Sequence, residues 1–595
     1  MKQMKSLLEN PHGFSVSLVF DGLLVGIFAG CISVIYRLLL NNAEKLLFTI
    51  IAFTKTRPFW IAVWFIVLIV MGLIVGWLMS WEGMASGSGI PQVQGELKGY
   101  LNQNWHRVLC SKIIGGTLCI LGGLSLGREG PSVQLGAMVA KGIAKITKKS
   151  QTKERYMMTC GAGAGLAAAF NAPLAGVMFS LEELQKNFNS SMLVCIISGC
   201  VTSDFISKNV FGLSPVFDFH LKAALPLVHY WMLILLGILL GLCGAFYNFI
   251  MLKGQDLFGA MKKIPAKYRI VFPFVVSGIV CYTLPSILAG GHAMISLITG
   301  HTLLVSTMLL LLVAKFFFSA FCFGSGAPGG IFFPLLILGA YLGAIYGTLV
   351  IQASGIPSYY LVNFITISMA GFFTAIVRAP ITGILLIAEM TGTFEHFLSL
   401  AVVCIISYLV AHLLKSEPIY ESLLGRILAK NGFKESEDAD HKVLRGFAVG
   451  TGSIAAKQLV KDIPWPEHCL IVTLNRGDEE IIARGSTEIH AGDTIIALID
   501  DNYLGMVTES IQLICGEIIP EHPIVSTSAS WMIPSFTFSV SLQVPCCGAH
   551  QPTPCVSPEI SLISFAFTHL ASSGIGAAPW FTPWATGHII STSCE

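Results

Sequence analysis

The sequence predicts an all-α, multi-pass membrane protein built from two repeated halves with half-spanning helices, followed by a small α+β domain. Hydrophobic residues make up 54% of the 595 residues and charged residues only 12%, and the mean hydropathy is +0.72. This composition excludes a soluble protein of this size. Short motifs rich in glycine and proline occur twice along the chain, and the composition changes after Tyr420.

Apolar runs define the expected membrane segments. The long runs each approach the ~20 residues that a bilayer span requires, and they fall at 14–40, 58–80, 106–124, 190–208, 228–252, 268–288, 302–323, 336–352 and 395–414. Shorter runs begin at Gly or Pro, at 90–101, 130–144, 172–186, 331–350 and 380–391. Broken helices at membrane depth are tolerated where they line a cavity, so the short runs indicate helix ends that face a site.

Charged residues indicate which segments lie in the cytoplasm. Residues 1–13 form the expected cytoplasmic N-terminus, without a cleaved signal peptide, because no small-residue cleavage site follows the basic start. Basic clusters at 145–155 and 262–269 are typical of cytoplasmic loops. The net charge of +2, without a basic stripe, argues against nucleic acid as a partner. Most of the sixteen cysteines lie in apolar segments and are expected to be buried thiols.

The chain contains an internal repeat. Gly127, Pro131, Gly136 and Ala137 recur with the same spacing as Gly330, Pro334, Gly339 and Ala340. The stretch 172–176 with Glu182 recurs as 379–383 with Glu389. These echoes predict two related halves, at about 14–208 and 228–414, with a site between them near the membrane midplane. The repeat pattern is compatible with halves of the same or of opposite orientation in the membrane.

The remainder of the chain differs in composition from the apolar part. Residues 427–441 are expected to be a solvated linker, and 442–515 contain short β-type runs separated by turns such as Ala491-Gly492-Asp493. Residues 516–595 contain no Lys or Arg, are rich in Ser, Thr and Pro, and show no periodicity. They are interpreted as a disordered tail or an aberrant end of the reading frame, without an assigned function.

The stretch 127–132 places a carboxylate, Glu129, between two glycines and just before a helix-starting proline. A charge is costly in such an apolar sequence. A helix N-terminus presents free N–H groups and therefore suits an anion. We therefore expect Glu129 to compete with a permeating anion for one binding place.

Four further features are candidates, each with an ordinary structural alternative. Ser88 lies at a helix start in 87–91, which is also typical of a simple capped helix. The N–H groups of Ile331 and Phe332 follow a glycine-rich turn, which is a common feature. Glu183 falls about 15 Å along a helix beginning near Pro173, where it and its neighbour Glu182 could simply reach interfacial water. Tyr420 could equally be an interfacial tyrosine.

Together these motifs resemble the ClC family of chloride channels and proton-coupled chloride transporters. The resemblance covers residues 14–426 and is carried by 87–91, 127–131, 163–176 and 330–334, in that order. It implies inverted repeats and a homodimer with one anion pathway per subunit. It also implies a prokaryotic cell membrane as location, with chloride, protons and membrane lipids as partners and no cofactor.

The same resemblance implies individual residue functions. Ser88, with Gly89 beside it, and Tyr420 would hold a chloride ion. The N–H groups of Ile331 and Phe332 would complete the coordination shell of that ion. Glu129 would be the gate, supported by its motif neighbours Gly127, Arg128, Gly130 and Pro131. Glu183 matches the internal proton-transfer glutamate of the exchangers. Serine at position 88 favours chloride over nitrate and disfavours the fluoride-exporting branch.

Two departures and one further resemblance complete the comparison. Gln92 and Gln94 stand where many family members have glutamates, which bears on the internal proton route. Residues 442–515 resemble the TrkA-C domain, the C-terminal domain of regulators of potassium conductance. That resemblance implies a cytoplasmic regulatory module that binds an unidentified small ligand or pairs across the dimer.

The co-occurrence of Glu129 and Glu183 favours proton-coupled chloride exchange. A passive chloride channel, gated by voltage or pH, is the first alternative, and a membrane sensor with a vestigial pore is the second. An enzyme is not expected, because no nucleophile–base pair or metal-ligand set has suitable spacing.

Overall fold

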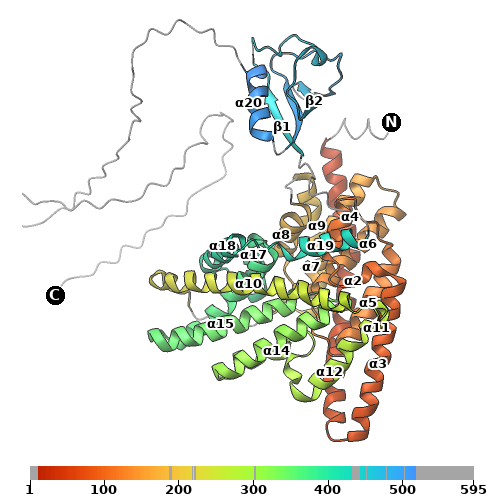
Figure 1. Cartoon of the computed structure of the whole chain (residues 1–595), viewed down its shortest axis with the longest axis vertical. Helices are drawn as coiled ribbons and strands as arrows, with labels where there is room; N and C mark the ends of the chain where they lie inside the picture. The colour runs from red at the N-terminus through yellow and green to blue at the C-terminus, as the bar shows by residue number, and fades with distance from the viewer. Residues whose placement is uncertain are drawn as a thin grey trace, which may run out of the picture. The chain divides into compact units, whose positions relative to one another are not determined.

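The computed structural model describes residues 11–186, 190–217, 219, 223–300, 303–431, 442–450, 452–476, 479–500 and 503–516. The chain divides near residue 443 into a helical unit and a small α+β unit, each considered by itself (Figure 1). This confirms the predicted fold class. The expected tail beyond Gly516 and most of the expected linker lie outside the described residues.

The helical unit is a succession of long and short helices. In chain order these are α2 (Pro11–Thr54), α3 (Pro58–Trp81), α4 (Ile90–Leu97), α5 (Trp105–Leu121), α6 (Glu129–Ile146), α7 (Gln151–Phe170), α8 (Pro173–Phe179), α9 (Ser190–Phe211), α10 (Tyr230–Ala260), α11 (Ala266–Arg269), α12 (Val271–Thr283), α13 (His292–Gly300), α14 (Val305–Gly324), α15 (Phe332–Ser354), α16 (Leu361–Val377), α17 (Pro380–Thr391), α18 (Phe397–Leu413) and α19 (Ile419–Lys430). Seven helical stretches in the described part are long and apolar enough to cross a membrane, within α2, α3, α9, α10, α14, α15 and α16.

Helices of one half pack mainly against each other. In the first half α2 contacts α5, α6, α7 and α9, and in the second α10 contacts α14, α15, α16 and α18. Figure 1 shows α10, α14 and α15 lying side by side. The short helices α4, α8 and α17 each begin with a proline in the first turn, where its missing N–H removes no helical hydrogen bond.

Several expected segments have different bounds. The first run continues as one helix to Thr54. The run at 268–288 is divided into α11, α12 and a 3₁₀ turn that begins at Pro285. The runs at 331–350 and 336–352 belong to a single helix, α15, because Pro334 lies in its first turn and does not interrupt it.

The apolar pattern of the sequence predicts no helix over α7 or α16. In α7, glycines interrupt the apolar pattern, but they allow close backbone contact with α6: a Cβ at Gly161 would lie 2.9 Å from the carbonyl carbon of Gly136. Small residues at such crossings are typical of helices packed in membranes. In α16, Ser and Thr break up the apolar run, and every residue from Asn363 to Val377 is buried.

The two halves meet through contacts that repeat partners make with each other. Gly127 and Gly330 form an antiparallel bridge, with N to O distances of 2.6 and 2.8 Å. Glu182 accepts hydrogen bonds from the backbone N–H groups that begin α17, at Ile381 (3.2 Å) and Thr382 (2.7 Å). Its repeat partner Glu389 accepts them from those that begin α8, Leu174 (3.1 Å) and Ala175 (2.8 Å). Such reciprocity follows from an approximate two-fold axis between the halves.

Two buried lysines show the same symmetry. Lys112 Nζ donates to the carbonyls of Ala85 (3.0 Å) and Gly87 (2.7 Å), just before α4. Lys315 Nζ, 203 residues later, donates to Ile287 O and Ala289 O at 2.9 Å each, just before α13. Each ammonium holds the turn that leads into a short helix, so α4 and α13 are repeat counterparts.

The small unit is a four-stranded sheet with one helix. Its elements are β1 (Lys442–Ala448), β2 (Cys469–Arg476), β3 (Glu479–Ile482), β4 (Thr494–Asp500) and α20 (Leu504–Cys515), and the strand order is β1-β4-β2-β3. β2 pairs antiparallel with both β3 and β4. Apolar side chains of the sheet and α20 form its core. The twelve cysteines in the described parts of both units are free thiols.

The predicted turn before β4 is held by an ion pair. Asp493, 1% exposed, accepts two hydrogen bonds from Arg476 at the end of β2, at 2.9 and 2.8 Å, and one from His490 N at 2.8 Å. The Arg476 guanidinium holds the pKa of Asp493 below its usual range. The pair therefore ties two neighbouring strands together at one end.

We predict that Asp493→Asn destabilises the small unit by about 1–2 kcal/mol at pH 7, because a charge-assisted bond is lost at a partly exposed arginine. Since the folded-state pKa is lowered, the carboxylate stabilises the fold above the usual Asp pKa of about 3.9 and loses this effect as the pH falls below it. Hydrogen exchange of β2 and β4 amides in the full chain measures this. A difference between variant and parent that persists unchanged at low pH would contradict the assignment.

Candidate functional site

The candidate site lies where three glycine-rich turns meet, just before α4, α6 and α15. Gly87 N donates to Gly326 O (3.4 Å) and Gly329 N donates to Gly87 O (3.0 Å). Together with the bridge between Gly127 and Gly330, these bonds bring the N-termini of the three helices to one place. Helix N-termini carry partial positive charge and free N–H groups, so the arrangement suits an anion.

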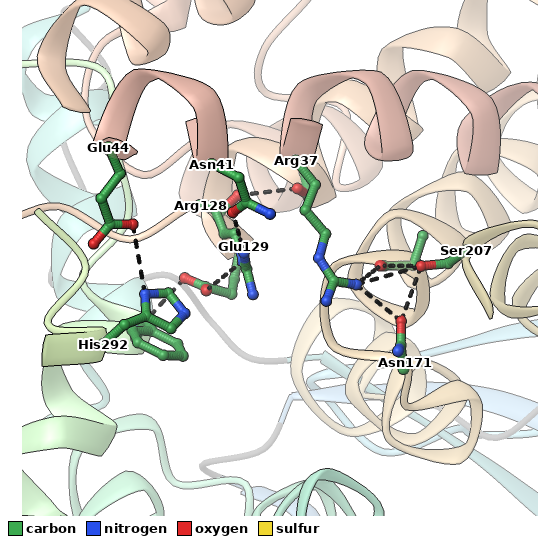
Figure 2. Close-up of polar contacts among 11 residues, drawn as sticks. Arg37, Asn41, Glu44, Arg128, Glu129, Asn171, Ser207 and His292 are labelled. Carbon is green, nitrogen blue, oxygen red and sulfur yellow. Dashed lines mark hydrogen bonds and ion pairs between the residues drawn. The ribbon is translucent and has the colours of Figure 1, made fainter. Parts of the chain in front are cut away.

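Glu129 occupies this place from the start of α6. Its side chain is fully buried, and its Oε2 accepts a hydrogen bond from Phe333 N, in the first turn of α15, at 3.3 Å. Arg128 Nε lies 3.7 Å from Oε1, which has no hydrogen-bond partner among the described residues (Figure 2). The carboxylate of one half thus lies at the helix start of the other half, at a place that suits a negative charge.

Glycines make this approach possible. A Cβ on Gly127 would lie 2.5 Å from Glu129 Oε2 and 3.1 Å from Phe333 N, and so would fill the space that the carboxylate uses. A Cβ on Gly130 would collide with Ser88, whose carbonyl oxygen would be 2.8 Å away. Gly89 has φ +97°, a left-handed conformation that side chains rarely adopt. Pro131 is the third residue of α6, where the backbone N–H has no helical partner, so the proline costs no hydrogen bond.

The two hydroxyls expected to hold an anion are buried. Ser88 is 2% exposed and Tyr420, in the first turn of α19, is 0% exposed. The two hydroxyls interact with each other, but neither makes a hydrogen bond of ordinary geometry with a described residue. A buried polar group left unsatisfied costs about 1–3 kcal/mol, so these hydroxyls are suited to a ligand that accepts hydrogen bonds. Ile331 and Phe332 are also buried, at the start of α15.

A cavity of about 510 Å³ reaches Ser88. Its described lining includes four basic side chains, Lys267, Arg269, Arg426 and Lys430, and no Asp or Glu. Arg426 pairs with Asp256 at 2.7 Å, outside the described lining. The cavity therefore presents a positive potential that attracts anions towards Ser88.

Glu183 lies on a π-helical turn, Ser180–Gln185, that follows α8. It is 3% exposed, and Gln94 Nε2 of α4 donates to its Oε1 at 2.8 Å and to its backbone O at 3.0 Å. π-Turns inside helices occur frequently at functional sites. Its neighbour Glu182 caps α17 instead, so the alternative that both glutamates simply reach interfacial water is wrong.

The structure thus brings the expected residues to the start of α4, α6, α15 and α19, and it adds two that the sequence analysis does not assign to the site. Phe333 N is the N–H that Glu129 contacts, although Ile331 and Phe332 were expected to face the anion. Gln94, noted only as a departure, holds Glu183 directly. No feature of the sequence near position 94 indicates that contact.

Comparison with known families and proteins supports the same reading. A family model described as voltage gated chloride channel matches residues 71–412, and a TrkA-C domain model matches 444–512. An H(+)/Cl(−) exchange transporter ClcA from Klebsiella pneumoniae is 32% identical over 437 residues, which cover 71% of this chain and 91% of that protein. The protein of the same name from Vibrio cholerae is 34% identical over 438 residues, covering 71% and 92%.

Solved structures have the same fold. A slow cyanobacterial Cl−/H+ antiporter aligns with a TM-score of 0.66 and 31% identity, and the alignment covers 70% of this chain and 99% of that one. A CLC-type fluoride/proton antiporter aligns with a TM-score of 0.57 and 20% identity, over 68% of this chain and 97% of that one, and shows the shared fold alone.

We predict that Gly127→Ala destabilises the protein by about 1–3 kcal/mol, the usual cost of inserting a methyl group into a packed interior. The added Cβ would displace the Glu129 carboxylate from Phe333 N. Thermal unfolding of the purified protein measures the effect, with Gly83→Ala as the control, because a Cβ there meets nothing within 4 Å. Equal melting temperatures for the two variants would show that the space at Gly127 is not required.

Proposed function

Because this chain belongs to the voltage gated chloride channel family, whose members are transporters and not enzymes, we propose that it exchanges chloride for protons across the cell membrane. In this proposal Glu129 is the gate and Glu183 is the internal proton-transfer group. The curated relatives described above are named exchange transporters, which supports exchange over a passive channel.

The observation that carries the proposal is the contact between Glu129 Oε2 and Phe333 N. Two negative charges cannot share one buried helix N-terminus, because their repulsion is strong where water is excluded. Chloride and an ionised Glu129 therefore exclude each other. Protonation of Glu129 removes its charge, weakens its hold on the N–H group and opens the place to chloride.

The anion route follows from the cavity and the buried hydroxyls. Chloride collects in the basic cavity and reaches Ser88 and Tyr420, where hydroxyls and helix N-termini replace its water shell. The first groups that it meets at Ser88 and Tyr420 are dipoles and not full positive charges. Binding there is weak enough for release, as fast transport requires.

The proton route uses a different carboxyl on the inner side. Glu183 is buried and is oriented by the amide of Gln94. Tyr420 lies within electrostatic range of both Glu183 and Glu129, so the two carboxyls are near the same anion place. A proton that moves from Glu129 to Glu183 therefore travels beside the chloride site, which couples the two ions in this proposal.

The remaining expectations form part of the proposal. The transport domain spans 14–426 and functions as a homodimer with one pathway in each subunit. Residues 442–515 form a cytoplasmic regulatory domain for an unidentified small ligand. No cofactor takes part in transport.

We predict that in proteoliposomes an imposed chloride gradient drives protons uphill. Glu183→Gln should abolish proton movement and retain chloride flux, because the amide cannot carry a proton while the anion site is untouched. Simultaneous chloride efflux and pH measurements test this. Glu182→Gln is the matched control, since Glu182 caps α17 and its neutral amide oxygen can still accept from the same N–H groups. Chloride flux without proton movement in the unmutated protein would identify a passive channel.

We also predict that Tyr420→Phe and Ser88→Ala each weaken chloride binding about fivefold to tenfold, which corresponds to about 1 kcal/mol for a neutral hydrogen bond. Titration calorimetry with chloride measures the affinity. Tyr346→Phe is the control, because the Tyr346 hydroxyl donates to Met232 O at 2.7 Å and takes no part in the anion site. An unchanged affinity in both site variants would remove these hydroxyls from the anion site.

A further inference from the structure

We propose that Glu44 and His292 form an outer proton-transfer station that delivers protons to Glu129 and removes them. This inference rests on the proposed exchange function. It concerns the side of Glu129 that faces away from the chloride cavity and from Glu183.

Glu44 and His292 come from distant parts of the chain. Glu44 lies on α2, one turn beyond Asn41, which accepts a hydrogen bond from Arg128 at 3.3 Å. His292 is the first residue of α13, and its Nδ1 lies 3.7 Å from Glu44 Oε2. Figure 2 shows Glu44 and His292 beside Arg128 and Glu129.

His292 is separated from Glu129 by the ring of Phe333. Its imidazole stacks on the ring of Phe333, with centroids 4.5 Å apart and an interplanar angle of 28°. Phe333 is the residue whose N–H holds Glu129. The stacking fixes the position of the imidazole relative to the carboxylate.

A small cavity joins these groups. It has a volume of about 20 Å³ and is lined by Glu44, Arg128, Glu129, His292 and Phe333 among others. A cavity of about 10–15 Å³ already admits one water molecule when polar partners surround it. One such water can connect His292 with Glu129 Oε1, the buried oxygen that has no hydrogen-bond partner among the described residues.

The solvent exposure of the side chains decreases from His292 through Glu44 to Glu129. The side chain of His292 is 43% exposed, that of Glu44 is 19% exposed, and Glu129 is fully buried. His292 can therefore exchange protons with water, whereas Glu129 cannot do so directly. An imidazole can accept a proton on one ring nitrogen and release one from the other, so it can relay protons even when its charged form is rare.

The charges around His292 explain why Glu44 is needed. Removal from water lowers the pKa of His292 to about 3, and the positive charges of Arg128, Arg37 and Lys315 add to this effect. Glu44 is the carboxylate in contact with the ring. It is therefore placed to stabilise the imidazolium during the brief time that the ring carries the proton.

The transfer is a simple proton relay. His292 takes a proton from outer water, and an N–H bond forms. That bond then breaks as the bridging water receives the proton and gives one of its own to Glu129 Oε1, where an O–H bond forms. The imidazole returns to neutrality, and Glu129 becomes neutral. The reverse sequence returns the proton to outer water.

The internal repeat indicates that the histidine is a particular feature of this side. Gly89 and Gly291 precede α4 and α13 with similar positive φ angles, +97° and +101°. The residue after the glycine is Ile90 at α4, fully buried, and His292 at α13. The fold therefore accepts an apolar residue at this position. The titratable residue, His292, occurs in the half where this position adjoins Glu129.

The test is His292→Phe, which keeps an aromatic ring on Phe333 and removes proton transfer. In proteoliposomes we expect chloride-driven proton movement to fall at least about 100-fold, the lower end of what a positioned proton-transfer group contributes. Undiminished exchange would overturn the proposal.

A second background separates proton transfer from packing. Glu129→Ala has no gate to protonate, so adding His292→Phe should leave its chloride flux unchanged. An equal loss of flux in both backgrounds would show that His292 acts only through packing and would overturn the proposal.

Two further variants complete the design. Glu44→Gln leaves the ring in place and should reduce proton movement in the same direction, so the proposal remains testable if His292→Phe does not fold. His229→Phe, in the 3₁₀ turn before α10, is the control and should behave as the parent. If the parent moves no protons, both the exchange function and this inference fail. If the parent exchanges and both His292→Phe and Glu44→Gln exchange normally, only this inference fails.

Discussion

Two backbone hydrogen bonds between Gly127 and Gly330 hold the starts of α6 and α15 against each other, and the site depends on them. Only residues without a side chain allow the two turns to approach so closely. Glu129 then reaches across to Phe333 N of the other half. The anion place is thus a property of the contact between the halves, and neither half forms it alone.

The glutamates of the helical unit differ in what holds them. Glu182 and Glu389 are held by backbone N–H groups, and Glu183 by an amide. Glu96, by contrast, pairs directly with the ammonium of Lys141. A carboxyl held by neutral donors can lose its charge without leaving a buried cation unpaired, whereas one held by a lysine cannot. Glu129 pairs with Arg128 at 3.7 Å, but Arg128 also donates to Asn41 at 3.3 Å and so keeps a partner when the carboxyl is neutral.

The local chemistry of the helix starts could be predicted from the sequence, because glycine, proline and a misplaced charge have direct physical meanings. Glu129 was recognised on that basis, and the internal repeat indicated that its helix has a partner. Contacts between distant segments could not be predicted. Nothing near Gln94 shows that it meets Glu183, and His292 lies 248 residues after Glu44, in the other half. Helix α7 was not predicted, because its glycines weaken the apolar pattern. The same glycines allow α7 to pack closely against α6.

The reciprocal caps at α8 and α17 also bear on biosynthesis. Leu174 N and Ala175 N receive their carboxylate from Glu389, which the ribosome adds more than two hundred residues later. Domains synthesised first generally fold first, but here the first half emerges with an uncapped helix and a carboxylate, Glu182, that has no partner yet. The order of synthesis and the order of completion therefore differ, and both halves reach their final structure together.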